Sequence, residues 1–145
     1  MNIRQKIRKY TNNGHKTLLG VGPMSQNIVD VTIELAEKYD APLMLIASRR
    51  QIDSDYHGGG YVNNWTTEDF SKYVRSKSQE QKVVLARDHG GPWQNESEKL
   101  NCLSLEEAMA SAKRSYETDI DAGFQILHID PSVSINGVVS AYDSL

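Results

Sequence analysis

The stretch VVLARDHGGPWQ, residues 83–94, passes from an apolar, β-branched segment directly into charged and imidazole side chains. An apolar run of this length before a Gly-Gly-Pro turn is typical of a buried strand. Arg87, Asp88 and His89 therefore fall at the carboxyl end of that strand. Parallel α/β folds bind their ligands at this edge of the sheet. The stretch thus predicts both a fold class and the place of a site.

Three other segments have the length of a strand and are apolar on both faces, as strands of a buried parallel sheet are. They are TLLGV (17–21), PLMLIA (42–47) and FQILHI (124–129), and they join KVVLA (82–86). Amphipathic helical patterns lie between the four segments and before the first. The resulting order, α-β-α-β-α-β-α-β, predicts an α/β fold with parallel strands and right-handed crossovers.

The helix ends carry recognisable capping residues. Ser25, Thr66 and Ser104 are predicted N-caps, Ser104 forms a capping box with Glu107, and Gly123 is the left-handed C-terminal stop. The apolar residues that share one helical stripe are, in chain order, Ile3, Ile7 and Tyr10; Ile28, Val31, Leu35 and Tyr39; Phe70, Tyr73 and Val74; and Leu105, Ala108, Met109, Ala112 and Tyr116. We expect the last two stripes to face the core.

Every predicted strand ends in polar or glycine-bearing residues, which favours a (β/α)8 barrel (TIM barrel) over a doubly wound sheet. A complete barrel needs about 250 residues, and this chain has 145. We therefore expect residues 1–145 to form a single domain that is the N-terminal half of a barrel, with about four βα units, and to be a fragment of a longer protein. Its unpaired strand edges would be covered by a partner, by self-association or by the remainder of that protein.

Charge and composition exclude several classes of partner. The 16 basic and 19 acidic residues leave a net charge of −3, and no run of lysine or arginine indicates binding to nucleic acid or to a membrane surface. No segment has the apolar length of a signal peptide core or a membrane span, so we expect a cytoplasmic protein. The single cysteine, Cys102, cannot form an intramolecular disulfide.

Three segments occur in the same order and at the same spacing as in a known family: LMLIASRRQID followed by GGGYVNNWTTEDF, then ARDHGGPWQ, then AGFQILHIDPSV. The chain resembles the N-terminal half of the non-catalytic (Z-type, GatZ/KbaZ-like) subunit of class II D-tagatose-bisphosphate aldolase. The resemblance implies a TIM barrel, a role in galactitol or amino-sugar catabolism, and a catalytic aldolase subunit as partner.

In the catalytic relative of that family, an aspartate and a histidine follow the third strand as acid/base and zinc ligand. Asp88 and His89 match these positions, and Asp130 lies in the matching motif after the fourth strand. The resemblance therefore implies Asp88 and Asp130 as candidate catalytic residues and His89 as a metal ligand. Zn²⁺ is then expected only in a full-length or complexed form, because the other metal histidines belong to the second barrel half. Arg87 departs from the family pattern, since a guanidinium beside Asp88 suits phosphate binding but repels a dication.

Other interpretations of these residues stay open. Asp88 is equally compatible with a turn in which it accepts backbone N–H bonds from the glycines that follow. His128 lies inside an apolar strand and is predicted to be a buried, hydrogen-bonded histidine. His57, beside three glycines, is predicted to be a loop residue rather than a ligand.

The long segment 48–65 between a strand and a helix is predicted to act as a binding loop or lid. Two arginines there are suited to clamp a sugar phosphate, and glycines 58–60 would let backbone N–H groups approach it. The alternative is that one arginine is a solvated charge and the other pairs with Asp53 or Asp55. Trp65 and Trp93 are predicted either to stack on a sugar or to pack in the core. The candidate substrate-binding residues are Arg49, Arg50, Gln51, Gly59, Gly60 and Arg87.

Three functions follow from these observations. The leading prediction is an accessory, stabilising subunit of class II tagatose-bisphosphate aldolase that binds a phosphosugar or the catalytic subunit. The alternative is a metal-dependent enzyme, an aldolase-like lyase that cleaves a carbon–carbon bond of a ketose bisphosphate, or an epimerase. A minor alternative is an NADP-binding module that uses Gly20 and Gly22, although Pro23 and Ser25 depart from the dinucleotide-binding pattern.

Overall fold

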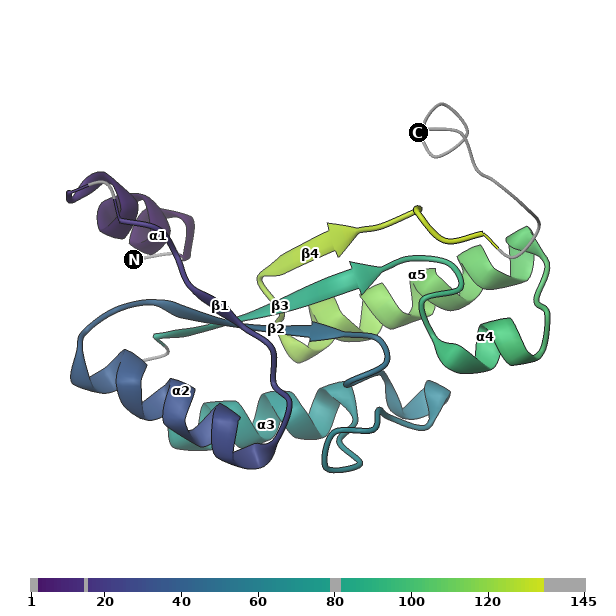
Figure 1. Ribbon diagram of the computed structural model, residues 1–145, viewed down its shortest axis with the longest axis horizontal. Helices are drawn as coiled ribbons and strands as arrows, with labels where there is room; N and C mark the ends of the chain where they lie inside the picture. The colour runs from purple at the N-terminus through teal and green to yellow at the C-terminus, as the bar shows by residue number, and fades with distance from the viewer. Residues whose placement is uncertain (1–2, 15, 79–81, 135–145) are drawn as a thin grey trace.

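Helices alternate with strands along the chain as the sequence predicts, except that a 3-10 helix and a short helix, α4 (Glu96–Leu100), are added between the predicted elements (Figure 1). The computed structural model describes residues 3–14, 16–78 and 82–134. No helix in these ranges is both long and apolar enough to cross a membrane. The elements are α1 (Ile3–Asn12), β1 (Gly20–Val21), α2 (Gln26–Lys38), β2 (Leu43–Ser48), the 3-10 helix η1 (Asp55–His57), α3 (Thr67–Lys77), β3 (Val83–Gly90), α4 (Glu96–Leu100), α5 (Leu105–Ala122) and β4 (Ile126–Ile129).

The four strands form one parallel sheet in the order β1-β2-β3-β4. Pairing between β2 and β3 is continuous, from Leu43 with Val83 to Ser48 with Asp88. Each strand lies beside the next one in the chain, which is the arrangement found in part of a (β/α)8 barrel. The predicted α/β fold class with parallel strands is confirmed.

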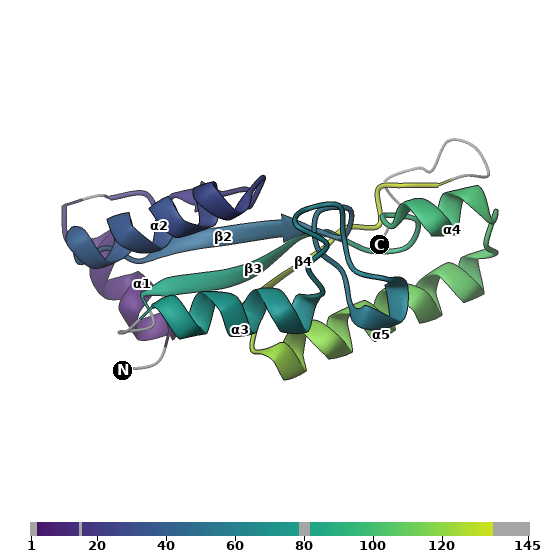
Figure 2. The same cartoon turned by 90° about the horizontal axis from the view of Figure 1, so that it is seen from below.

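The core lies between one face of the sheet and the helices α2, α3 and α5 (Figures 1 and 2). Successive side chains of a strand point to opposite faces, so only every second residue of β2 and β3 enters this core. Leu45 and Leu85 do so, against Val29 of α2 and Phe70 of α3. The alternate row of β3, which ends at Asp88, lies on the opposite face of the sheet.

The helices begin and end where their capping residues predict. The side chains of Ser25 and Thr66 accept hydrogen bonds from backbone N–H groups of α2 and α3. Ser104 and Glu107 form a reciprocal capping box at the start of α5, and Gly123 ends that helix with φ +83°. These local hydrogen bonds satisfy N–H groups that have no partner within the helix.

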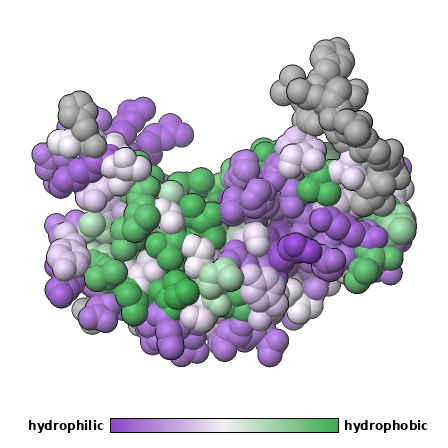
Figure 3. Space-filling view, viewed as in Figure 1, coloured by the Kyte–Doolittle hydropathy of each residue, from purple (hydrophilic) through white to green (hydrophobic). Residues whose placement is uncertain are grey.

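Two apolar stripes face outward. On α2 the predicted stripe is exposed, with exposed fractions of 37–66%, and the buried face consists of Val29, Thr32, Ile33 and Ala36. On α5, Ala108 and Ala112 are buried as expected, but Leu105 and Met109 are exposed, which corrects the predicted core face. Apolar periodicity could not distinguish the faces of α2, because both are apolar. Hydrophobic side chains accordingly gather on the surface over α2 and β1 (Figure 3).

The long connection between β2 and α3 is packed into the fold. Ile52, Val62 and Trp65 of this segment belong to the buried core. A Cβ added at Gly60 would lie 2.0 Å from the carbonyl oxygen of Gln51, so the chain approaches itself here as only glycine allows. Trp93, after β3, is buried too, so core packing is the confirmed alternative for both tryptophans.

Candidate functional site at the carboxyl ends of the strands

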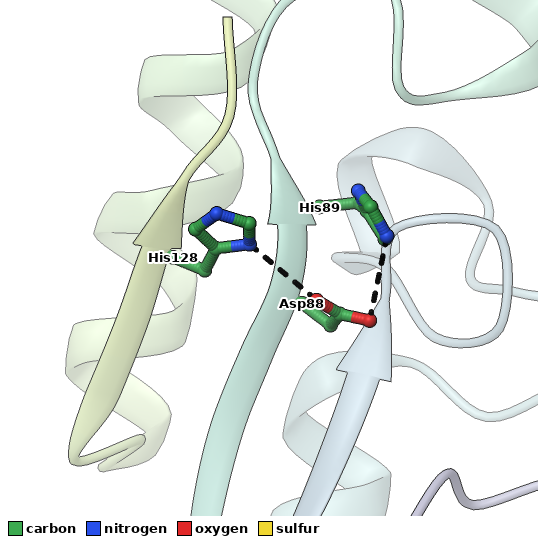
Figure 4. Close-up of side chains that lie close together, drawn as sticks. All are labelled: Asp88, His89 and His128. Atoms are coloured by element: carbon green, nitrogen blue, oxygen red, sulfur yellow. Dashed lines mark ion pairs between the residues drawn. The ribbon is translucent and has the colours of Figure 1, made fainter. Parts of the chain in front are cut away.

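Asp88, His89 and His128 lie together at the carboxyl ends of β3 and β4 (Figure 4). Oδ1 of Asp88 is 3.4 Å from Nδ1 of His128, and Oδ2 is 3.7 Å from Nε2 of His89. The three side chains are between 41% and 56% exposed. Within the described ranges, they form the one group of three His, Cys, Asp or Glu side chains close enough to share a metal ion.

Asp130, which follows β4, holds the other ring nitrogen of His89. Nδ1 of His89 is 2.5 Å from Oδ2 of Asp130. The side-chain amide of Gln94 donates to the same oxygen at 2.8 Å, and the backbone N–H of Ser132 donates to Oδ1 at 3.0 Å. These bonds join the ends of β3 and β4 at one edge of the sheet.

The same hydrogen bond shifts the titration of both partners. Bonding to Asp130 raises the pKa of His89; burial opposes this shift, and the charge of Asp88 adds to it. Burial alone would raise the pKa of Asp130, but hydrogen bonds from Ser132 and His89 outweigh it and hold the pKa at about 2. Asp130 is therefore a carboxylate at neutral pH. Because it accepts the Nδ1 proton of His89, it leaves Nε2 directed toward Asp88.

The backbone at the carboxyl end of β3 is irregular, and this irregularity brings the neighbouring side chains of Asp88 and His89 to one side. The register between β3 and β4 shifts between Arg87 and Gly90, and His89 has φ +46°. A Cβ at Gly91 would lie 2.0 Å from the carbonyl oxygen of Asp130. Regular alternation would separate Asp88 from His89, so the irregular end of β3 is what allows the two side chains to meet.

His128 is exposed, which corrects the prediction of a buried core histidine. It precedes Ile129, the last residue of β4, and β3 is the strand beside β4 in the order that the structure describes. Its ring therefore stands at the open edge of the sheet rather than between the sheet and a helix. Sequence alternation places His128 two residues after Ile126, but it does not say which face of β4 is covered.

Arg87 lies on the other face of β3 from Asp88, which corrects the expectation that the two side chains are neighbours. Its guanidinium is buried and binds both carboxylate oxygens of Asp119 in α5, at 2.6 and 2.7 Å. It also donates to the carbonyl oxygens of Ala47 and Ile52. Substrate binding by Arg87 remains a prediction, and it would require this buried ion pair to open.

Arg49 is also buried, and its guanidinium holds the loop after β2 in place. Nε donates to Asp53 at 3.0 Å, Nη2 contacts Glu98 at 2.7 Å, and Nη1 donates to the carbonyl oxygen of Gly91 at 2.9 Å. The structure therefore confirms the alternative in which one of the two arginines, Arg49, pairs with Asp53. The bond to Gly91 also ties this loop to the turn that follows β3 and His89.

The three buried acids were not among the residues that the sequence singled out for a site. Asp53, Glu98 and Asp119 are at most 1% exposed, and Arg49 and Arg87 are their partners. Acidic side chains are common on helix and loop surfaces, so the sequence gives no signal that Glu98 and Asp119 are buried, and it offers Asp53 only as a partner of an arginine. The one available signal is that Arg49 and Arg87 stand beside apolar strand residues, where a buried arginine needs an acidic partner.

A cavity of about 550 Å³ opens at the carboxyl end of β2, next to the strand that carries Asp88. Four of the predicted substrate-binding residues line it, together with polar residues at the start of α4. The lining residues are Ser48, Arg49, Arg50, His57, Gly58, Gly59, Gly60, Tyr61, Asn95 and Glu96. Gln51 is not among them, because its amide is bonded to the backbone N–H of Ser48 and to Met24.

The glycines of this cavity do not offer free backbone donors. The N–H groups of Gly58, Gly59 and Gly60 donate to carbonyl oxygens of Asp55, Ser54 and Trp65 at 2.9, 3.1 and 3.1 Å. This corrects the expectation that these N–H groups approach a phosphate. The glycines contribute shape, and the charged lining of the cavity comes from side chains.

Comparison with known proteins agrees with the fold and with the sequence motifs. The crystal structure of a probable tagatose 6 phosphate kinase from Sinorhizobium meliloti 1021 is similar, with a TM-score of 0.65 and 26% sequence identity. The match covers 84% of this chain and 30% of that chain, so the chain spans less than a third of that protein. The family model of the D-tagatose-1,6-bisphosphate aldolase subunit GatZ/KbaZ-like matches residues 3–143. The chain therefore belongs to the GatZ/KbaZ-like family of D-tagatose-1,6-bisphosphate aldolase subunits.

Proposed function

We propose that this chain serves carbohydrate catabolism in the cytoplasm as part of an accessory aldolase subunit, and that its strand-end cavity binds a phosphosugar. Family membership supports the class of subunit. The observation that carries the binding proposal is the cavity lined by Arg49, Arg50, Gly59 and Gly60, beside β3, the strand that carries Asp88 near its carboxyl end.

Arg50 is the residue that we assign to the phosphate group. Its guanidinium is 55% exposed and pairs with Glu96, which is 53% exposed. An ion pair between two exposed side chains contributes only about 0–1 kcal/mol. A phosphate offers a guanidinium two parallel charge-assisted hydrogen bonds, so it competes well with a single surface carboxylate. Arg49, by contrast, is buried, and its bonds to Asp53, Glu98 and Gly91 fix the shape of the cavity.

Calorimetric titration with a ketose phosphate tests this assignment. We expect Arg50→Gln to weaken binding at least about tenfold, since a hydrogen bond to a charged group contributes about 1.5–3 kcal/mol. Glu96→Gln should strengthen binding, because it removes the competitor of the phosphate. Arg8→Gln, at an exposed arginine of α1, is the matched control and should have no effect. Equal affinity in the Arg50 and Arg8 variants would rule out this role of Arg50.

The exposed apolar stripe of α2 is the surface that we assign to a catalytic aldolase subunit. Val31, Leu35 and Tyr39 are between 39% and 66% exposed on one side of this helix. Apolar patches of this kind on a soluble protein mark protein interfaces. Mixing the chain with a catalytic subunit should raise the Tm of that subunit, because a partner that binds only the folded state stabilises it.

Two lysine substitutions on α2 separate the stripe from the rest of the helix. Leu35→Lys should abolish this stabilisation, whereas Glu34→Lys, at a neighbouring exposed position, should preserve it. Loss of the effect in both variants would point to net charge rather than to the stripe. A dimer of the chain alone that Leu35→Lys dissociates would assign the stripe to a second copy instead.

The half-exposed Asp88 favours a second candidate function, a metal-dependent lyase or epimerase acting on a phosphosugar. A carboxylate at an open strand end, beside two histidines, is placed as a general acid/base has to be. In this case Asp88→Asn in the full-length protein should abolish cleavage or epimerisation of the sugar and leave partner stabilisation intact. An unchanged turnover in that variant would exclude this alternative.

A further inference from the structure

The ligand atoms of Asp88, His89 and His128 are spaced as the ligands of one metal ion are. The carboxylate oxygens are 3.4 and 3.7 Å from the two imidazole nitrogens. Charge-assisted hydrogen bonds are shorter, at about 2.7–2.9 Å. A tetrahedral ion with ligand bonds of about 2.1 Å, in contrast, separates its ligands by about 3.4 Å. The three side chains thus converge on a point between them more than they bond to one another (Figure 4).

The hydrogen-bonding partner of His89 gives an independent indication. Histidines that bind metals almost always donate their other ring N–H to a carboxylate, a backbone carbonyl or a water, which orients the ring and makes the ligating nitrogen more basic. Asp130 is buried and accepts this bond from Nδ1 of His89 at 2.5 Å. Gln94 and Ser132 in turn hold Asp130. Nε2 of His89 is left directed toward Asp88.

We propose that Asp88, His89 and His128 bind one divalent transition-metal ion, with Zn²⁺ as the candidate. Two imidazoles and one carboxylate form a ligand set that transition metals prefer over Ca²⁺ or Mg²⁺, which take mainly oxygen ligands. All three side chains are about half exposed, so further coordination positions face solvent.

This ligand set differs from the one that the family resemblance implies. There Asp88 is an acid/base and the other metal histidines belong to the second barrel half, whereas here β3 and β4 of one chain supply all three ligands. The proposal concerns the same strand-end edge as the phosphosugar proposal but does not depend on it. When bound, such an ion would polarise a carbonyl or hydroxyl oxygen of a ligand at this edge.

Titration of the metal-free chain with Co²⁺, followed by visible absorption, and competition with Zn²⁺ test the site. We expect one ion per chain. His89→Ala, His128→Ala and Asp88→Asn should each weaken binding by at least about 100-fold, and Asp130→Asn by about 10–100-fold because it acts through His89. Asp121→Asn, at an exposed carboxylate of α5, is the matched control and should bind as the unmodified chain does. Circular dichroism of each variant checks that it folds.

Three outcomes would overturn the proposal. The first is the absence of saturable 1:1 binding to the folded chain. The second is unchanged affinity in His128→Ala, which would show that β4 supplies no ligand to the metal. The third is an equal loss in Asp121→Asn, which would indicate unspecific binding. Failure of this test is distinguishable from failure of the phosphosugar proposal, because the Arg50 titration is performed with a chelator present.

Discussion

The carboxylate of Asp53 is fully buried, and both of its oxygens accept hydrogen bonds. Arg49 and Asn95 donate to Oδ2 at 3.0 and 2.9 Å, and Ser115 donates to Oδ1 at 2.7 Å. His57 lies 3.5 Å from Oδ1. A buried charge destabilises a protein unless it is paired and hydrogen-bonded in this way. Asp53 is therefore the residue on which the loop after β2 depends.

Removal of the charge from Asp53 should strongly destabilise the fold. Asp53→Asn leaves the buried guanidinium of Arg49 without part of its counter-charge, and breaking a buried pair costs about 3–5 kcal/mol. Asp55→Asn, at an exposed position in the same loop, should change the free energy of unfolding by less than about 0.5 kcal/mol. Urea denaturation of both variants measures the difference. Similar values for the two variants would show that Asp53 is not a structural anchor.

The stability of the fold should decrease in acid because of the same carboxylate. Burial alone would raise the pKa of Asp53, but the hydrogen bond with His57 and the charges of Arg49 and Arg87 outweigh it and lower the pKa below its ordinary value of 3.8. The unfolded state then binds the proton first as the pH falls. The stabilisation by Asp53 is complete above about pH 4 and is lost as the pH falls through the lowered pKa.

Denaturation curves at several acidic pH values measure this dependence. Asp130, whose pKa is also lowered, contributes in the same direction. The variant Asp53→Asn isolates the contribution of Asp53, since its stability should vary less steeply with pH than that of the unmodified chain. Identical slopes for the two proteins in acid would contradict the assignment.

Among the elements, the turn after β3 decides how the strand-end residues are arranged. Gly91 passes so close to the backbone of Asp130 that a side chain has no room, and Arg49 binds the carbonyl oxygen of Gly91. The turn is thereby fixed from β4 on one side and from the loop after β2 on the other. Local sequence predicts a turn here, but these long-range contacts give it its shape.

Gly91→Ala should therefore destabilise the chain and disturb the edge of the sheet. The added Cβ would lie 2.0 Å from a backbone oxygen, and overpacking of this kind costs about 1–3 kcal/mol. Gly22→Ala is the matched control, because its nearest neighbour is the amide nitrogen of Gln51 at 3.5 Å. Thermal denaturation compares the two variants. We expect a lower Tm for Gly91→Ala alone, and an equal decrease in both would refute the steric argument.

For the molecule as a whole, the described sheet has a well-paired centre and weakly paired margins. β2 and β3 pair along six residues of β2, whereas β1 contributes only Gly20 and Val21 to the sheet. β3 is almost entirely buried, and Ile129 at the end of β4 is 74% exposed. Stability within the fold should follow this gradient, because local opening needs less free energy where fewer contacts are lost.

Hydrogen exchange followed by mass spectrometry measures that gradient. Amides of β2 and β3 should exchange slowest, and those of β1 and β4 should exchange faster. Binding of a partner or a second copy over the exposed apolar surface should slow exchange in α2 and β1 in particular. Uniform exchange rates across the four strands would show that the margins are as stable as the centre.

The order of the four strands and of α1, α2, α3 and α5, the parallel arrangement and the caps at Ser25, Thr66, Ser104 and Gly123 follow from local patterns and are confirmed, whereas η1 and α4 are not predicted. These features depend on hydrogen bonds and periodicities within a few residues, which are independent of the contacts that the segment makes with distant parts of the chain. The inward direction of Arg49 and Arg87, the exposed face of α2 and the open position of His128 depend instead on which surfaces become covered. Burial is a property of neighbours distant in sequence, so packing assigned these residues, and through them it arranged the candidate site.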